Sequence, residues 1–262
     1  MMQSKDQLGR ILNVPQTPQR VISLVPSQSE FLWELGLGDR LVGITKFCRK
    51  PEQMFKQVTK TGGTKKIDFA KLVSLKPDLV IANKEENTRE EILKVSEIFP
   101  VWISDVNTFD QAFEMMSELG LILELEEKAS ELVQQAKDSV EKSRSLFYPE
   151  SLAYFIWNKP YHLAGSDNFI HHVIEHIGFK NAAADRKRYP EVSAETLKAM
   201  NPARCFLSSE PFPFEEKHVK ELSVLLPDTK ITRVDGEMFS WYGSRLIHLH
   251  NYLLKLKQQL YA

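Results

Sequence analysis

The sequence contains only two cysteines, Cys48 and Cys205, and they lie far apart in the chain. Two distant cysteines cannot build a disulfide framework or a cysteine-ligated metal cluster. An excess of charge of one sign is also lacking, because 34 basic residues balance 35 acidic residues and leave a formal net charge of −1. The whole protein therefore has no field that would attract nucleic acid, and we expect no nucleic-acid partner.

Long apolar runs and an export signal are lacking as well. No apolar stretch approaches the roughly 20 residues that a membrane span needs. The segment from Met1 to Arg20 has neither the apolar core nor the small-residue cleavage site of a signal peptide. As the chain stands we expect it in the cytoplasm, and in the periplasm if an upstream leader was removed.

Sequence motifs of catalysis are missing too. There is no G-x-G-x-x-G after a strand, no phosphate-binding loop, no G-x-S-x-G and no H-E-x-x-H. A catalytic set would need a nucleophile beside a base, or paired carboxylates in different environments. We therefore expect a binding protein and not an enzyme. The minor alternative is an enzyme whose site forms around Cys48 or around the Glu85–Glu86 pair.

What the sequence does contain is an alternation of short β-type runs with helical patterns, which predicts an α/β fold with mostly parallel sheets flanked by helices. The segment Asp68–Glu86 is echoed by Ser193–Pro211, with Pro77 and Pro202 in register, and this indicates two related lobes. The predicted strands are Val21–Val25, Leu41–Ile44, Leu79–Ala82, Val101–Ser104, Leu152–Trp157, Cys205–Ser208 and Ile231–Val234.

A long polar segment separates the two halves. Glu124–Ser145 contains neither glycine nor proline, and its apolar residues form one narrow stripe at helical spacing. A helix of this length would reach about 33 Å. It is either another surface crossover helix or a rigid strut between two lobes, and the new set of strands after it favours the strut. We expect an N-terminal lobe over residues 1–123, a backbone helix over 124–147 and a C-terminal lobe over 148–262.

Aromatic residues collect in the loops that follow the predicted strands, where open α/β sheets bind their ligands. Aromatic loops are costly to leave in water unless they cover something apolar or planar. Packing of lobe on lobe without a ligand is the alternative explanation. His172 and His176 have a spacing that can bind a metal, but a solvated helix face explains them more simply.

Several segments together resemble one known family. RVISLVPSQSEFLWELGLGDRLVGIT, KIDFAKLVSLKPDLVIANKEEN, the central charged helix, PYHLAGSDNFIHHVIEHIGFKN and VSAETLKAMNP resemble the class III, helical-backbone substrate-binding proteins of iron-siderophore and vitamin B12 ABC importers. The likeness extends over nearly the whole chain, from Arg20 to Leu260. It implies two α/β lobes with little closure motion, and no catalysis. It also implies a monomer whose inter-lobe cleft holds an iron chelate such as a siderophore complex or haem, or a corrinoid such as cobalamin.

The resemblance also implies which residues line the cleft. The residue after the first strand, an aromatic residue of the next loop and aromatic residues of the second lobe take this role, and basic residues could meet acidic groups of a siderophore. The loops offer no histidine except His162, so we expect no site for a bare metal ion. The candidate ligand-binding residues are Pro26, Ser27, Phe47, Cys48, Arg49, Lys84, Glu85, Trp157, Tyr161, Phe212, Trp241, Tyr242 and Arg245.

Importer-bound members of the family dock on their ABC permease through one surface glutamate on each lobe. Glu195 matches the second of these positions. The corresponding position of the first lobe holds Ala70, and only Asp68 lies close enough to substitute. Two interpretations therefore stay open: the binding component of an importer, and a cytoplasmic cofactor carrier or sensor with the same fold and no permease partner.

Overall fold

The structure is a computed structural model that describes residues 1–261. The chain forms two units, and each is made from separate segments of the sequence. The first unit consists of 1–106, 110–137 and 242–247. The second consists of 107–109, 138–241 and 248 onwards.

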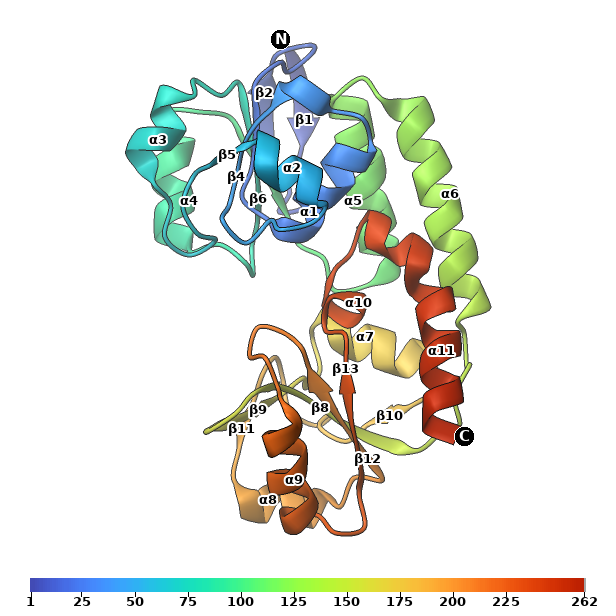
Figure 1. The fold of residues 1–262 in the computed structure, drawn as a ribbon. Coiled ribbons are helices and arrows are strands. Elements are labelled where there is room, and N and C mark those ends of the chain that lie inside the picture. Colours follow the sequence, from blue (N-terminus) through green and yellow to red (C-terminus); the bar gives the residue numbers. More distant parts are fainter. Residues whose placement is uncertain (262) are drawn as a thin grey trace. The chain divides into compact units, whose positions relative to one another are not determined.

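The sheet of the first unit is parallel throughout, as predicted for this half of the chain. Its strand order is β5-β4-β3-β6-β7, and every neighbouring pair runs parallel. Figure 1 labels β4, β5 and β6 of this sheet. The strands are β3 (Val21–Ser23), β4 (Leu41–Ile44), β5 (Thr59–Lys60), β6 (Leu79–Asn83) and β7 (Val101–Ser104). The helices between and after them are α1 (Pro26–Glu34), α2 (Glu52–Gln57), α3 (Phe69–Ser74), α4 (Arg89–Ser96) and α5 (Phe109–Ile122).

The central strands of this sheet read as uninterrupted apolar runs because helices cover both of their faces. All five residues of β6 and all four residues of β7 are buried. Helix starts follow local chemistry. Pro26 occupies the first helical position of α1, where no backbone N–H is needed, and the Asp68 side chain accepts from the Lys71 amide to cap α3.

The chain begins with an antiparallel hairpin that the hydrophobic pattern does not predict. Strands β1 (Met2–Lys5) and β2 (Ile11–Val14) pair with each other, and within residues 1–261 they pair with no other strand. The buried Asp6 carboxylate accepts hydrogen bonds from the Leu8 and Arg10 amides and closes the turn. A side-chain cap of this kind fixes a turn without leaving an apolar alternation in the sequence.

The sheet of the second unit is mixed. Its order is β11-β9-β8-β12-β13, with β10 beside β8; β8, β12 and β13 run parallel, whereas β9 runs antiparallel to both of its neighbours. The strands are β8 (Ser151–Trp157), β9 (Tyr161–Leu163), β10 (Lys180–Asn181), β11 (Glu191–Val192), β12 (Arg204–Ser208) and β13 (Lys230–Val234). The helices are α7 (Phe169–His176), α8 (Ala194–Met200), α9 (Glu216–Leu225), α10 (Glu237–Ser240) and α11 (Leu249–Tyr261).

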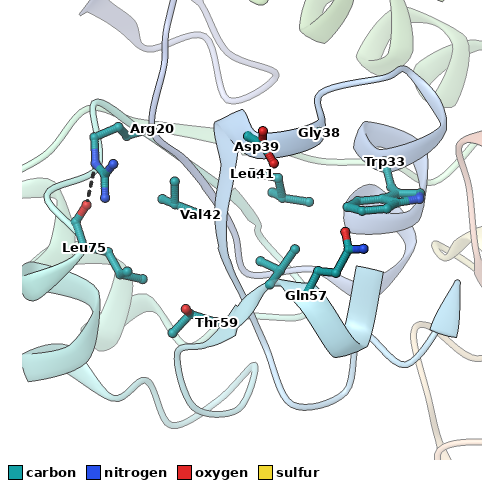
Figure 2. A pocket seen from close by; sticks show the side chains of 10 residues that line it. Arg20, Trp33, Gly38, Asp39, Leu41, Val42, Gln57, Thr59 and Leu75 are labelled. Carbon is teal, nitrogen blue, oxygen red and sulfur yellow. Dashed lines mark hydrogen bonds between the residues drawn. The ribbon is translucent and has the colours of Figure 1, made fainter. Parts of the chain in front are cut away.

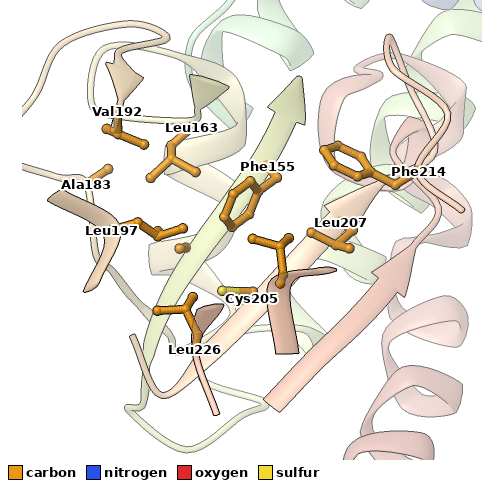
Figure 3. Packing of buried hydrophobic residues seen from close by; sticks show 11 residues of the cluster. Phe155, Leu163, Ala183, Val192, Leu197, Cys205, Leu207, Phe214 and Leu226 are labelled. Atoms are coloured by element: carbon orange, nitrogen blue, oxygen red, sulfur yellow. The ribbon is translucent and has the colours of Figure 1, made fainter. Parts of the chain in front are cut away.

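One apolar cluster fills the space beside this second sheet. Phe155 and Leu207 from neighbouring parallel strands meet Leu197 and Leu226 from the flanking segments (Figure 3). Cys205 lies in the middle of this cluster and is fully buried, so it serves as a small apolar side chain, as predicted. Burial raises the pKa of its thiol to about 12.

The long polar helix is present as α6 (Glu126–Lys142), with 17 residues and a length of about 26 Å. It is shorter than expected because Glu124 adopts a left-handed conformation, with φ 54°, and separates it from α5. The predicted apolar stripe is buried along its whole length, from Ala129 to Val140. The unit boundary falls inside α6, after Lys137. The separate status of residues 124–147 as a backbone helix therefore stays a prediction.

Among residues 1–261, no helix combines the length and the apolar character that crossing a membrane requires.

The close contact between α5 and α6 yields a stability prediction. Replacing a helical glycine by alanine normally stabilises a helix by about 1 kcal/mol. At Gly120, however, an added Cβ would lie 2.3 Å from the Cβ of Ala129. We expect Gly120→Ala to lower the free energy of unfolding by about 1–3 kcal/mol, measured by urea denaturation.

The control is the double variant Gly120→Ala/Ala129→Gly, which moves the missing methyl group to the other helix. It should recover to within about 1 kcal/mol of the parent chain. A stabilised single variant would show that the two helices do not pack as closely as described.

Candidate functional site

The candidate residues of the first unit gather at one edge of its sheet. Because the strands are parallel, the loops that follow them emerge at the same edge. Pro26 and Ser27 follow β3, the segment 47–49 follows β4, and Lys84 and Glu85 follow β6. The segment 242–247 also belongs to this unit and brings Tyr242 and Arg245.

A buried polar network, which the sequence reasoning missed, lies under this edge. The Asn83 side-chain amide donates to the Ser104 hydroxyl and carbonyl, at 2.9 and 3.2 Å, and the Gln28 amide also donates to that hydroxyl. The backbone N–H of Asn83 donates a hydrogen bond to the side-chain oxygen of Asn87 at 2.9 Å. All four side chains are buried. Buried polar groups satisfied in this way hold neighbouring strand ends in one arrangement.

This network fixes the backbone of the loop after β6. Asn83 Oδ1 accepts from the amides of Glu85 and Glu86, at 2.8 and 3.0 Å. Asn87 Nδ2 donates to the Thr64 carbonyl of the loop after β5 at 2.8 Å. The sequence signal was present in the pattern N-K-E-E-N, since an asparagine at a strand end and another four residues later can close such a loop.

Phe47 and Cys48 point in different directions although they are neighbours. The Phe47 ring is 48% exposed and lies beside Gly63, where any Cβ would come within 3.2 Å of it. Cys48 is fully buried, and its sulfur lies 3.2 Å from the Ser29 hydroxyl and 3.1 Å from the Thr45 hydroxyl. Burial raises the pKa of the Cys48 thiol, although these hydrogen bonds oppose the rise. A buried, protonated thiol is a poor nucleophile.

The basic candidates of the first unit are not equivalent. Arg245 forms a two-pronged ion pair with Glu30, with nitrogen–oxygen distances of 2.6 and 3.0 Å, and both side chains are largely buried. Lys84 pairs with Asp105 at 2.5 Å. Arg49 is exposed. Arg245 therefore has its charge compensated inside the protein, and it ties the segment 242–247 to α1.

Tyr242 belongs to the same segment as Arg245. Its ring is buried, and burial raises the pKa of its phenol, with the carboxylates of Glu86 and Glu85 adding to the rise. The phenol therefore stays protonated.

The aromatic candidates of the second unit also share one edge. Trp157 ends β8, and Tyr161 begins the antiparallel β9, so both lie at the carboxyl end of β8. Trp157 is 43% exposed, and its ring contacts Phe212 edge to face with centroids 5.5 Å apart. Phe212 in turn contacts Phe214 at 4.9 Å. Tyr161 lies edge to face on the buried Phe155 at 5.7 Å. The structure thus brings the predicted aromatic side chains together within this unit.

Trp241 ends α10 and is almost fully buried. Beside it lies Glu210, a residue that sequence reasoning did not nominate. Glu210 accepts a hydrogen bond from the Ser240 hydroxyl at 2.8 Å. Burial raises the pKa of the Glu210 carboxyl, the Ser240 bond opposes the rise, and the nearby carboxylate of Glu237 adds to it.

The two residues expected to dock on a permease differ in structure. Glu195 is exposed in the first turn of α8, where hydrogen bonds from its own amide and from Ser193 lower the pKa of its carboxyl. Asp68 is the cap of α3, as Ser193 is the cap of α8. Asp68 therefore occupies the position equivalent to Ser193, and Ala70 is the equivalent of Glu195.

The first unit also contains a hollow of about 290 Å³ (Figure 2). Leu41 and Thr59 begin their strands, and Arg20 directly precedes β3, so the hollow lies at the amino ends of the strands. Arg20 on one side donates to the Leu75 carbonyl at 2.8 Å, and the Trp33 ring stands on the other. None of the predicted site residues lines it.

No group of three or more metal-binding side chains occurs among residues 1–261. The histidines of α7 take part in packing: the rings of His172 and His176 both lie 4.9 Å from the ring of Phe109. His176 Nε2 also lies 2.8 Å from the Val140 carbonyl, and burial lowers the pKa of its imidazole. The expectation of a fully solvated histidine face was therefore wrong for His176.

The fold points to a class of binding proteins. The family model of the periplasmic binding proteins matches residues 21–222, and the chain belongs to this family. An uncharacterized ABC transporter substrate-binding lipoprotein of Bacillus subtilis, YvrC, is 29% identical over 208 residues, which are 75% of this chain and 66% of that protein. The vitamin B12-binding protein of Vibrio cholerae is 27% identical over 203 residues, which are 76% of this chain and 73% of that protein.

A solved structure shows the same fold. The periplasmic heme-binding protein BhuT, in complex with two hemes, matches with a TM-score of 0.81 at 20% identity, and the match covers 94% of this chain and 100% of that one. These likenesses confirm the predicted α/β fold class and the resemblance to substrate-binding proteins. The relatives are named as binding proteins, in agreement with the expectation that the chain is not an enzyme.

The environment of Cys48 leads to a prediction about thiol chemistry. Because the sulfur is buried and the pKa of the thiol is raised, we expect it to react with a disulfide reagent at neutral pH at least about tenfold more slowly than in the unfolded chain. Reaction should accelerate as the pH rises towards the raised pKa. The variant Cys205→Ala isolates the signal of Cys48, and a fast reaction of the folded variant would revive the idea of a catalytic thiol.

Proposed function

We propose that this protein is the substrate-binding component of an ABC-type importer and holds an iron chelate, haem or cobalamin. Membership in the periplasmic binding protein family supports this role, as do relatives named for vitamin B12 and heme. An importer role would place the protein outside the cytoplasmic membrane. Recognition would come from the loops at the carboxyl ends of the strands in each unit.

The observation that carries the proposal is the exposure of two aromatic rings at these loops. Phe47 is 48% and Trp157 is 43% exposed. Each ring is held from one side, Phe47 by Gly63 and Trp157 by Phe212. Rings that are fixed in place and open on one side offer flat apolar surface to a conjugated ligand without a large loss of side-chain entropy.

The basic candidate residues would then have two different roles: some would contact the ligand, and one would hold a segment of the protein in place. Arg49 and Lys84 have exposed side chains that could meet acidic groups of a chelate. Arg245, paired with the buried Glu30, would act as a support for the segment 242–247. Pro26, Ser27, Glu85, Tyr161, Phe212, Trp241 and Tyr242 complete the proposed lining, while the buried Cys48 would contribute only to its packing.

Titration of the protein with cyanocobalamin, haemin and a ferric siderophore, followed by tryptophan fluorescence, tests this function. A coloured ligand near Trp157 should quench its emission. We expect Trp157→Leu to weaken binding of the ligand that responds by about two- to twelvefold, since an aromatic contact of this kind is worth about 0.5–1.5 kcal/mol.

The matched control is Tyr148→Leu, which removes another exposed aromatic ring of the second unit away from the carboxyl-end loops. It should leave affinity unchanged. Absence of a response to all three compounds in the parent protein would refute the proposed ligand class.

A second function, a cytoplasmic carrier or sensor without a permease, is favoured by one observation: the first unit has Ala70 where the second has Glu195, and Asp68 is used as a helix cap.

The two functions predict different effects of the substitution Glu195→Lys. For an importer component, we expect the variant to abolish ligand uptake by cells while the titration stays unchanged. Glu216→Lys, an equal charge change at another exposed helix start of the same unit, is the control. Normal uptake with Glu195→Lys would favour the carrier.

A further inference from the structure

A buried histidine lies behind the aromatic side chains at the carboxyl edge of the second unit. His218 is the third residue of α9 and is 5% exposed. Its ring contacts Phe212 edge to face, with centroids 5.2 Å apart, and Phe214 at 5.6 Å. Phe212 is also the ring that contacts the exposed Trp157. The imidazole is therefore one contact away from a ring on which the proposed function depends.

The polar side of this imidazole holds the start of α9. His218 Nδ1 accepts a hydrogen bond at 2.8 Å from the backbone N–H of Glu215, the residue before the helix. A side chain at the third helical position that accepts in this way forms one half of a capping box. Because Nδ1 accepts, it carries no proton, and the bond assigns the neutral tautomer with its hydrogen on Nε2.

The same histidine controls the position of the loop before α9. The loop at 209–215 joins β12 to α9 and carries Phe212. Near its end, Phe214 belongs to the buried apolar cluster of this unit (Figure 3), whereas Phe212 is only partly buried and packs against that cluster. His218 meets the loop twice, through the ring of Phe212 and through the amide of Glu215. A movement of the imidazole therefore acts directly on the Phe212 ring.

Protonation would remove both contacts. Histidine is the side chain whose charge ordinarily changes between about pH 5 and about pH 8. A proton on Nδ1 of His218 turns the acceptor into a donor, which then faces the N–H donor of Glu215. The new charge would also lie in a buried ring, at the amino end of a helix where positive charge is unfavourable. The protonated ring is therefore favoured where it turns towards water and leaves Phe212.

We infer that His218 is a positioning residue that, in its neutral form, holds Phe212 against Trp157. Protonation of His218 releases this pair of rings and weakens ligand binding. The inference rests on the proposed function, because it takes Trp157 as part of the ligand-binding surface. His218 acts through the two rings and needs no ligand contact of its own.

The charged groups around the imidazole do not stabilise its protonated form in the buried position. They come from α9 and its cap, from the turn between β8 and β9 and from β13, and they are Glu215, Glu221, Lys217, Lys159 and Arg233. Lys217 pairs with Glu215 at 2.7 Å, and Lys159 pairs with Glu221 at 2.9 Å. Each of these carboxylates already has a cationic partner, so neither is left to compensate a charge on His218.

The first experiment needs no ligand. The indole N–H signals of the four tryptophans are followed by NMR in protein labelled with nitrogen-15, and the Trp157 signal is identified by its loss in Trp157→Leu. From about pH 8 to about pH 5 the Trp157 signal should shift, because the contact with Phe212 is lost. The shift should vanish in His218→Gln, whose side-chain oxygen accepts from the Glu215 amide throughout this range.

The matched control is His248→Gln, which replaces an exposed histidine of the same unit. In this variant the Trp157 signal should shift with pH as it does in the parent. A Trp157 signal that ignores the pH, or that shifts equally in His218→Gln, overturns the inference.

The second experiment measures affinity for haemin and cyanocobalamin at about pH 8 and about pH 5.5. Parent affinity should be about two- to twelvefold weaker at the lower pH, which corresponds to the net contribution of one hydrogen bond. His218→Gln should bind within about twofold of the parent at the higher pH and should lack this loss. The ratio of the two proteins at each pH cancels any titration of the compound itself.

A third variant tests whether His218 acts through Trp157. His218→Phe keeps a ring against Phe212 but has no acceptor for the Glu215 amide. It should bind about two- to twelvefold more weakly than the parent already at the higher pH. In a Trp157→Leu background the same substitution should have no further effect, because the ring that His218 positions is already gone.

Different results separate the two hypotheses. If neither compound binds the parent protein, the proposed function fails, while the NMR titration still decides whether His218 controls the Trp157 ring. If a compound binds and its affinity falls equally with pH in the parent and in His218→Gln, the positioning role fails and the proposed function stands. An equal loss of affinity for His218→Phe with and without Trp157 would show a general structural role, which also overturns the inference.

Discussion

The hydrogen bonds of Asn83 are the interaction on which the first unit depends. A fully buried parallel strand has to change into a loop at this residue, and every polar group near the change must find a partner away from water. Asn83 and Asn87 meet this requirement with side chains instead of further sheet. They join the ends of β6 and β7 to the loops after β5 and β6, so several loops of the edge share one support. The side-chain amides of Asn83 and Asn87 have all of their donors and acceptors bonded, which gives this edge a single shape.

The sequence predicted the elements whose signal is local and missed those whose signal is distant. Continuous apolar residues mark the strands around Ile22, Val80 and Phe206 in the sequence. The topology rule for parallel strands then places most candidate residues at the carboxyl edges of the sheets, where the structure also has them. The partners of Arg245 and Ser240 could not be found in this way. Glu30 and Glu210 are ordinary glutamates in their local sequence, and only folding brings them against their donors. The hairpin at the start of the chain was missed because a side-chain cap, not an apolar pattern, closes it.

The return of residues 242–247 to the first unit has a consequence for how this protein can be divided or recombined. The first half of the gene does not encode the first unit completely, since a six-residue piece is supplied from near the other end of the chain. Without that piece, Glu30 would lose the guanidinium that neutralises it, and Phe31 would lose the backbone of Gly243 that covers it. An exchange of lobes between relatives by a single crossover would therefore join Glu30 of one parent to the returning segment of another. The two ends of the chain have to change together, which makes this small segment a constraint on the whole gene.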